Sequence, residues 1–231
     1  FPFEPELYAG SGLRCQFIGH PLANQIEFNP DPVEFRTALD LPLTGPLLGI
    51  LPGSRVSEVK RLLPLFIDAF DLLVSETPDL MGVIPAATDD LYALIQSMIS
   101  ERSIYVVHGQ SRQIMAAVTA VLLASGTAAL EAVLTGRPTV AAYRMNPWTY
   151  WMVRGQLQTE FVTLPNFLAK QALIPEFIQG DASVYSIVDA MTPMLNEGPT
   201  AHFMMEARKI HESLGGDVTD RGATAIVGYL S

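Results

Sequence analysis

The stretch that decides the fold is AVLLASGTAALEAVLTGRPTVAAY, residues 120–143. It opens with an apolar run over 120–124, which is typical of a strand buried on both faces. Three small residues, Ser125, Gly126 and Thr127, follow, and then a helical pattern that carries one carboxylate, Glu131. A glycine and a proline end the helix, and TVAAY begins a second strand. The stretch therefore predicts a strand–helix–strand unit whose first turn is built of small residues.

The same alternation runs through the chain on the N-terminal side of this unit. Apolar strands separated by amphipathic helices predict an α/β fold, a Rossmann-like parallel sheet with helices on both faces. The segments expected are strands at 47–51, 80–86 and 103–109 and helices at 57–76, 89–100 and 111–118. In the first of these helices we expect Ser57 to be the N-cap, and Pro64 to break or kink the segment into a short helix and a longer one.

The two ends of the chain have a different pattern. Residues 15–19 are strand-like, and 20–32 resemble a linker. We interpret His20, beside the linker proline, as structural rather than as a proton carrier. An aromatic, amphipathic segment at 146–161 is expected to be helical after its proline. Its aromatic side chains suit contact with an acyl chain and core packing equally well. C-terminal helices are expected near 182–196, 199–214 and 217–230.

Composition excludes several classes of protein. The formal net charge of the 231 residues is −10, which argues against a protein that tracks nucleic-acid phosphates. The single cysteine, Cys15, excludes an internal disulfide and a cysteine-based zinc site, and the four histidines lack metal-ligand spacing. No apolar run approaches the roughly 18 residues that a membrane-spanning helix needs. The sequence thus predicts no metal site, no cofactor and no nucleic-acid partner.

Ser125, Gly126 and Thr127 mark a candidate anion site. Ligands of open α/β sheets collect at the carboxyl ends of the strands, and a helix N-terminus offers unpaired N–H groups to a phosphate. Glu131 lies one turn further along, where a carboxylate can accept hydrogen bonds from a ribose diol. The alternative is that Ser125 is merely an N-cap and Glu131 a solvated helix residue, and spacing alone leaves both open.

A second small-residue turn, PGSR, follows the strand at 47–51. It contains Gly53, Ser54 and Arg55, and the planar guanidinium of Arg55 can pair with a diphosphate. A tight turn with a surface arginine is the alternative interpretation.

Taken together, five stretches resemble one known family. They are FPFEPE, FIGHPL, LLGILPGSRVSEVKRLLPLF, ASGTAALEAVLTGRPTVAAYR and TLPNFLAKQALIPEFIQ, in the order and at the spacing of the lipid-A-disaccharide synthases, glycosyltransferase family 19. The resemblance runs from residue 1 to about 180. The LPN…PE…Q stretch together with GHPL makes it specific, because GSR and SGTAxLE alone indicate only a sugar-nucleotide enzyme.

The resemblance implies the GT-B architecture, in which two Rossmann-like domains face each other and the C-terminal one binds the sugar nucleotide. It implies transfer of 2,3-diacylglucosamine from UDP-2,3-diacylglucosamine to 2,3-diacylglucosamine 1-phosphate, which gives lipid A disaccharide 1-phosphate and UDP. The anomeric centre inverts and no metal is needed. The enzyme is expected to be cytoplasmic and peripheral on the inner membrane, and a homodimer is left open.

Set against the family pattern, this sequence is expected to lack the N-terminal acceptor domain. We expect residues 1–22 to be its tail, 23–46 a linker, 47–180 the UDP-sugar-binding Rossmann-like domain and 181–231 C-terminal helices. The catalytic base stays unknown, since the family's base is expected in the missing domain. The chain is also acidic, whereas peripheral enzymes on anionic membranes usually carry basic patches.

The resemblance also gives roles to the residues singled out. The N–H groups of Gly126 and Thr127 are expected to hold the diphosphate, with Arg55 adding a positive charge and Glu131 accepting from the ribose. Asn166 and Gln179 are expected to face the glucosamine or the cleft. The competing interpretations are another GT-B transferase that uses a UDP-sugar, and a non-catalytic UDP-binding fragment.

Overall fold

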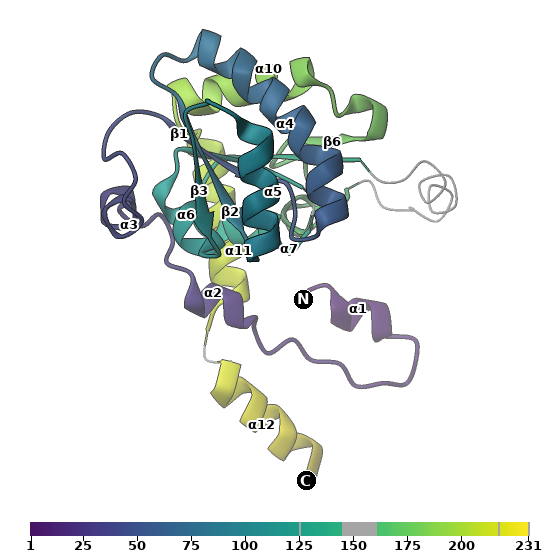
Figure 1. The fold of residues 1–231 in the computed structure, drawn as a ribbon. Helices are drawn as coiled ribbons and strands as arrows, with labels where there is room; N and C mark the ends of the chain where they lie inside the picture. Colours follow the sequence, from purple (N-terminus) through teal and green to yellow (C-terminus); the bar gives the residue numbers. More distant parts are fainter. Residues whose placement is uncertain (125, 145–160, 217, 231) are drawn as a thin grey trace.

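Six parallel strands form the centre of the molecule in the computed structural model (Figure 1). The structure describes residues 1–124, 126–144, 161–216 and 218–230. The strands are β1 (Leu47–Leu51), β2 (Met81–Ala86), β3 (Ile104–His108), β4 (Ala120–Leu123), β5 (Thr139–Tyr143) and β6 (Glu176–Ile178). Their order in the sheet is β3-β2-β1-β4-β5-β6.

The middle of the sheet lies between β1 and β4, where the strand order reverses. Leu47 of β1 pairs with Met81 on one side, and Leu48 pairs with Ala120 on the other. Every residue of β1 and β4 is buried, because helices cover both faces of the sheet. In open α/β sheets the crevice at such a reversal, at the carboxyl ends of the strands, is where ligands bind.

The helices form a layer on each face of the sheet (Figure 1). Their bounds are α1 (Glu4–Tyr8), α2 (Pro21–Gln25), α3 (Pro32–Ala38), α4 (Val56–Glu76), α5 (Asp89–Ile99), α6 (Ser111–Ala117), α7 (Thr127–Leu134), α9 (Leu164–Ala169), the 3₁₀ turn η1 (Gln179–Asp181), α10 (Val184–Asn196), α11 (Ala201–Leu214) and α12 (Val218–Leu230). One hydrophobic core joins the sheet to α4, α5 and α10, and a second joins it to α2, α6, α7 and α11. The expected α/β sheet with helices on both faces is confirmed.

The first long helix, α4, differs from its expectation in two respects. It begins at Val56, with Arg55 rather than Ser57 as the N-cap. It also runs without interruption past Pro64, so the expected break is wrong. Pro64 is exposed, and it lies on the solvent side of a helix whose other face is fixed to the sheet by buried residues such as Phe66 and Phe70. Burial of that face offsets the loss of one backbone hydrogen bond.

The segment before the sheet is folded onto it rather than extended. The expected linker, residues 23–46, contains α3 and most of α2, and its Ala23, Ile26 and Leu41 belong to the second core. His20 is the N-cap of α2, because its Nδ1 accepts the N–H of Leu22 at 3.3 Å, so its structural interpretation is confirmed. The strand-like run at 15–19 forms no strand in the structure.

The three C-terminal helices were expected and are present as α10, α11 and α12. The last of them lies away from the sheet, below α2 and α11 in Figure 1, and its described side chains are exposed or only half-buried. The helix expected after Pro147, with its aromatic residues, and Ser125 lie outside the described residues. Among the residues that are described, no helix has the length and apolar character to cross a bilayer.

Candidate functional site

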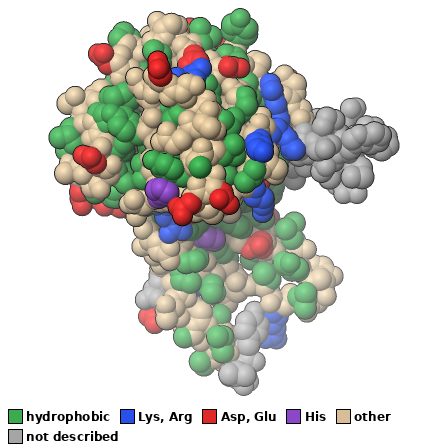
Figure 2. All heavy atoms as spheres, viewed as in Figure 1, with side chains coloured by type: hydrophobic (Ala, Val, Ile, Leu, Met, Phe, Trp, Pro, Cys, Tyr) green, Lys and Arg blue, Asp and Glu red, His purple; other side chains and the backbone are tan. Residues whose placement is uncertain are grey.

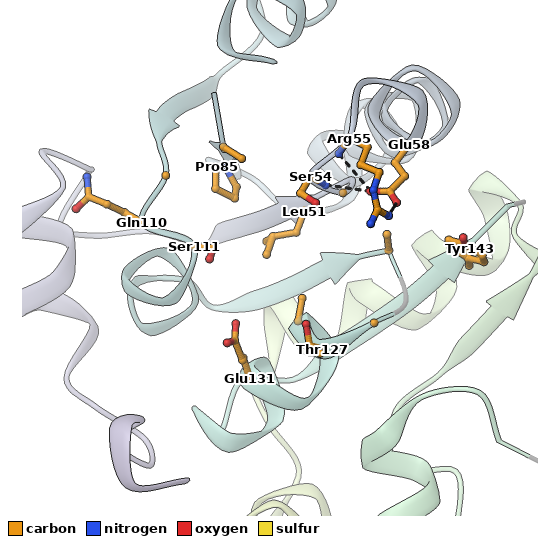
Figure 3. Close-up of a pocket in the computed structure, with 16 residues that line it drawn as sticks. Leu51, Ser54, Arg55, Glu58, Pro85, Gln110, Ser111, Thr127, Glu131 and Tyr143 are labelled. Atoms are coloured by element: carbon orange, nitrogen blue, oxygen red, sulfur yellow. Dashed lines mark hydrogen bonds and ion pairs between the residues drawn. The ribbon is translucent and has the colours of Figure 1, made fainter. Parts of the chain in front are cut away.

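A pocket of about 540 Å³ lies at the carboxyl ends of the strands, on either side of the β1–β4 reversal. Figure 3 shows its side chains converging from the carboxyl ends of strands and from the turns and helix starts that follow them. The lining residues are Leu51, Gly53, Ser54, Arg55, Glu58, Pro85, Ala87, Gly109, Gln110, Ser111, Ala124, Gly126, Thr127, Ala128, Glu131 and Tyr143. Six candidate residues from two separate sequence motifs therefore meet in one cavity.

The N-terminus of α7 opens into this pocket. Its N-cap is Gly126, which has a φ of +139° and gives the helix no side-chain cap. Apart from its chain neighbours, no heavy atom of the described residues lies within 4 Å of the position that a Cβ on Gly126 would take. The first N–H groups of a helix carry partial positive charge, and here they lie beside unfilled space. This end of α7 has the geometry that an anionic group needs.

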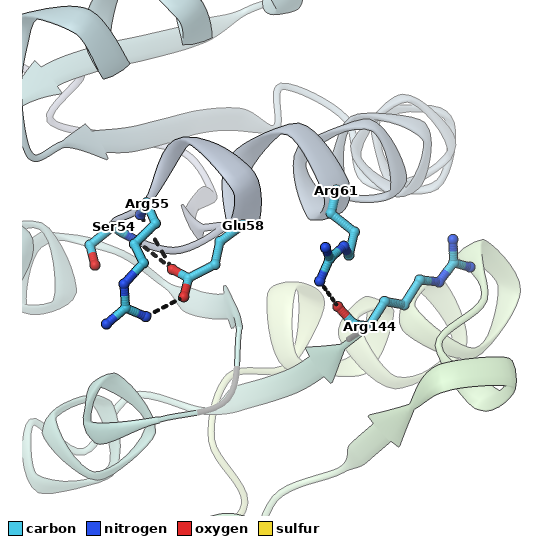
Figure 4. Close-up of polar contacts among 5 residues, drawn as sticks. All are labelled: Ser54, Arg55, Glu58, Arg61 and Arg144. Carbon is cyan, nitrogen blue, oxygen red and sulfur yellow. Dashed lines mark hydrogen bonds and ion pairs between the residues drawn. The ribbon is translucent and has the colours of Figure 1, made fainter. Parts of the chain in front are cut away.

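The N-terminus of α4, across the pocket, is already closed by a carboxylate. Glu58 Oε2 accepts the N–H groups of Ser54 at 3.1 Å and Arg55 at 3.3 Å, and Glu58 Oε1 accepts from Arg55 Nη1 at 2.8 Å (Figure 4). The Arg55 side chain is nevertheless 77% exposed, and its guanidinium points toward the pocket (Figure 3). The first turn of α4 thus offers a side-chain cation to a ligand rather than its backbone donors.

Glu131 lies on the pocket side of α7, with its carboxylate directed into the cavity (Figure 3). Its side chain is only 15% exposed and pairs with Arg112 of α6 at 3.0 Å. It is therefore not the solvated helix residue of the alternative interpretation. A half-buried carboxylate that is held by one cation and faces a cavity can accept hydrogen bonds from hydroxyl groups of a ligand.

Two candidate residues are not brought to the pocket. Asn166 is 1% exposed, and its amide donates to the carbonyl of Ile174 and accepts the N–H of the same residue, both at 2.8 Å. Its amide closes the turn between α9 and β6, and Asn166 is not among the residues that line the pocket. Gln179 begins η1 at the carboxyl end of β6, and it is not among the pocket's lining residues.

Four of the pocket residues that are not sequence candidates have polar side chains. Gln110 and Ser111 follow β3, Tyr143 ends β5, and Glu58 lies in the first turn of α4. The rule that selected Gly126 also applies to the turn after β3, where Gly109 and Gln110 both have positive φ. The pairing of Glu58 with Arg55 could not be predicted from the sequence, because an acidic residue in the first turn of a helix is common whether or not it pairs with an arginine.

Basic side chains gather on one side of this acidic molecule, at the right in Figure 2. Figure 4 shows three arginines that come from two elements near the pocket: Arg55 and Arg61 from the start of α4 and Arg144 from the end of β5. Arg61 Nη1 donates to the carbonyl of Arg144 at 3.5 Å. A local group of cations favours anionic ligands even where the net charge is −10.

Comparison with known proteins gives consistent relatives. A family model described as lipid-A-disaccharide synthetase matches residues 1–225. The lipid-A-disaccharide synthase of Pseudomonas putida is 38% identical over 99% of this chain and 61% of its own length. The synthase of Chromohalobacter salexigens is 41% identical over 97% of this chain and 60% of its own. The chain thus spans about three fifths of the length of these curated relatives.

A solved structure agrees with the fold. WaaG, a glycosyltransferase involved in lipopolysaccharide biosynthesis, superposes with a TM-score of 0.50 at 14% sequence identity. The match covers 85% of this chain and 50% of that one. At this level of identity the likeness concerns the fold alone.

Proposed function

Because this chain belongs to the lipid-A-disaccharide synthase family, we propose that it is the donor-binding part of an inverting glycosyltransferase. The proposal rests above all on one observation: the PGSR and SGTAxLE turns, far apart in sequence, meet in one pocket where the strand order reverses. The donor is UDP-2,3-diacylglucosamine and the acceptor 2,3-diacylglucosamine 1-phosphate. The products are lipid A disaccharide 1-phosphate and UDP.

The reaction demands stabilisation of a leaving diphosphate. The acceptor 6-hydroxyl oxygen attacks the anomeric carbon of the donor and forms the β-1,6 bond, while the bond from that carbon to the UDP oxygen breaks. The electron pair stays on the diphosphate, so negative charge grows there. The N–H groups at Gly126 and Thr127 and the guanidinium of Arg55 supply fixed positive charge to that position, which lowers the barrier.

Recognition of the nucleoside falls to Glu131. Its carboxylate lies one helical turn from the N-terminus of α7, so a diphosphate at that terminus leaves the ribose within reach. Hydrogen bonds from ribose hydroxyls to a carboxylate are charge-assisted and short. The pocket extends beyond Glu131 to Ser111 and Gln110, which gives the base a place at the carboxyl end of β3.

The rest of the activity involves parts that lie beyond this pocket. The base that takes the proton of the acceptor hydroxyl belongs to the portion of the relatives that the chain does not cover. Association with the cytoplasmic face of the inner membrane and assembly as a homodimer complete the proposal. The chain alone is then expected to bind UDP and to show no transfer, and adding the remaining portion of a relative should restore transfer.

Calorimetric titration with UDP tests the assignment of the pocket. Glu131→Ala and Arg55→Ala should each weaken binding by about 1–3 kcal/mol, roughly 5- to 150-fold, because each removes one polar contact to a charged group. Lys209→Ala is a matched control, because Lys209 pairs with Glu206 on the surface of α11. Its affinity for UDP should equal that of the unmodified chain.

Unchanged affinity in both Glu131→Ala and Arg55→Ala would contradict the pocket assignment.

A donor screen separates the proposal from other GT-B transferases. UDP-2,3-diacylglucosamine should support transfer in the restored enzyme, whereas UDP-N-acetylglucosamine should not.

A further inference from the structure

Arg112 connects the pocket to the segment that precedes the sheet. Its Nε and Nη2 both lie 3.0 Å from Glu131 Oε1, and its Nη1 donates to Gln25 Oε1 at 3.0 Å. Gln25 is the last residue of α2, and Arg112 is the second residue of α6. The Arg112 guanidinium therefore links α6 to both α7 and α2.

The contact with Glu131 is one-sided. Arg112 Nε donates to Oε1, Nη2 forms an ion pair with the same oxygen, and among the described residues Oε2 receives no hydrogen bond. Two guanidinium nitrogens on one oxygen hold the carboxylate in a single orientation, because a rotation about its last torsion would lengthen both contacts. Oε2 is then left as an oriented acceptor at the pocket surface.

Arg112 itself does not line this pocket. It lines a neighbouring groove of about 450 Å³ together with Gln25 and Gln113. The backbone explains its place, because Gly109 and Gln110, with φ values of +60° and +57°, turn the chain sharply from β3 into α6. Arg112 thus contacts the Glu131 carboxylate from the neighbouring groove, and it affects a ligand in the pocket only through Glu131.

We propose that Arg112 is a positioning residue for nucleoside recognition. It fixes Glu131 so that Oε2 faces the ribose hydroxyls of the donor. This inference rests on the proposed function, in which Glu131 binds the ribose. It adds that the selectivity of the pocket for a ribose depends on Arg112 of α6, which Gln25 of α2 helps to hold in place.

The test compares two ligands that differ only at the ribose. The chain is titrated with UDP and with 2′,3′-dideoxyuridine 5′-diphosphate, and the ratio of the two affinities is measured for each variant. In the unmodified chain UDP should bind about tenfold more tightly, as the loss of one or two polar contacts predicts. Glu131→Ala should bring the ratio close to one.

Arg112→Ala should lower the same ratio at least threefold and leave affinity for the dideoxy ligand within about twofold of its original value. Arg112→Lys, which keeps a cation and one donor, should retain an intermediate ratio. The double variant Arg112→Ala/Glu131→Ala should behave like Glu131→Ala alone, since the two side chains act as a unit. Arg102→Ala is the matched control, because Arg102 makes a comparable two-point contact to Asp71 outside the pocket.

Three results would overturn the inference in distinguishable ways. If Arg112→Ala weakens both ligands equally, the arginine contacts the diphosphate or base, or only maintains the fold. If Arg112→Ala and Arg112→Lys both keep the original ratio while Glu131→Ala loses it, the ribose contact stands and the positioning role fails. If the unmodified chain does not bind UDP, or does not discriminate between the ligands, the ribose assignment itself fails and the inference with it. Arg112→Lys keeps the test decisive if the alanine variant does not fold.

Discussion

At the scale of single residues, the pocket depends on two glycines, and a side chain at each position would have a different effect. Gly53 and Gly126 both have φ values in the left-handed region, +120° and +139°. A Cβ on Gly53 would lie 2.5 Å from Glu58 Oε2, whereas a Cβ on Gly126 would meet no atom of the described part of the chain within 4 Å. Gly53 therefore leaves room for the Glu58 side chain to fold back over the turn at residues 53–55. Gly126 leaves the N-terminus of α7 accessible from the pocket.

This difference predicts unequal costs for two identical substitutions. Gly53→Ala should lower the free energy of unfolding by about 3 kcal/mol, because backbone strain and a steric clash add. Gly126→Ala should cost about 1 kcal/mol, because only the strain applies. Urea denaturation of the two variants measures the gap. Equal costs would show that Glu58 moves aside without penalty.

At the scale of elements, two buried arginines complete the end of α6. Arg36 Nε donates to the carbonyl of Ala117, and Arg137 Nη2 donates to that of Ala116, both at 2.8 Å. These carbonyls have no partner within the helix. Both arginines also donate to carbonyls of residues 30–45, so that they attach α3 and its flanking loops to the sheet. Burial lowers the pKa of both guanidinium groups, but from a value so high that they stay charged.

Arg137→Met tests this attachment. It should lower the free energy of unfolding by about 3 kcal/mol, because it leaves buried carbonyls without donors. Arg102→Met is the surface comparison, and it should cost at most about 1 kcal/mol, as exposed ion pairs do. Thermal or urea unfolding gives both values. A loss for Arg137→Met no larger than that for Arg102→Met would contradict the structural role.

At the scale of the whole molecule, the buried residues of both cores lie between Ala23 and Leu214. Of the segments outside these bounds, α12 lies away from the body (Figure 1), whereas the N-terminal segment packs Phe1 and Phe17 against the second core. Exposed apolar side chains occur on both of them, including Leu7, Leu13 and Ile226. The stability of the sheet is therefore expected to be independent of α12.

A chain that ends at Gly216 tests this independence. Its unfolding midpoint in calorimetry should lie within about 2 °C of the full chain's, because that shift corresponds to less than 1 kcal/mol in a chain of this size. The contacts of Asn24 with Gly216 are kept in this variant. A fall of more than about 5 °C would mean that α12 contributes to the core of the domain.

The sequence predicts best those elements whose burial is complete. The strand at Leu47–Leu51 is apolar throughout because both of its faces are covered, and an unbroken apolar run of this length can be recognised in the sequence. β6 was missed because it has only three residues, all half-buried. Gly53, Arg55 and Glu131 line one pocket, as the rule that parallel strand ends share an edge leads one to expect. Asn166, which was assigned from the family resemblance, instead pairs with Ile174 in a local turn that no spacing rule describes.

The reversal between β1 and β4 has a consequence for how the protein is made. β1 emerges from the ribosome long before β4, because β2 and β3 are translated between them. Until residues 120–123 are available, one edge of a fully apolar central strand has no partner. Unpaired strand edges of this kind are prone to aggregate, and long-range parallel pairing is slow. A nascent chain halted before Ala120 is therefore the form in which this protein should depend most on chaperones.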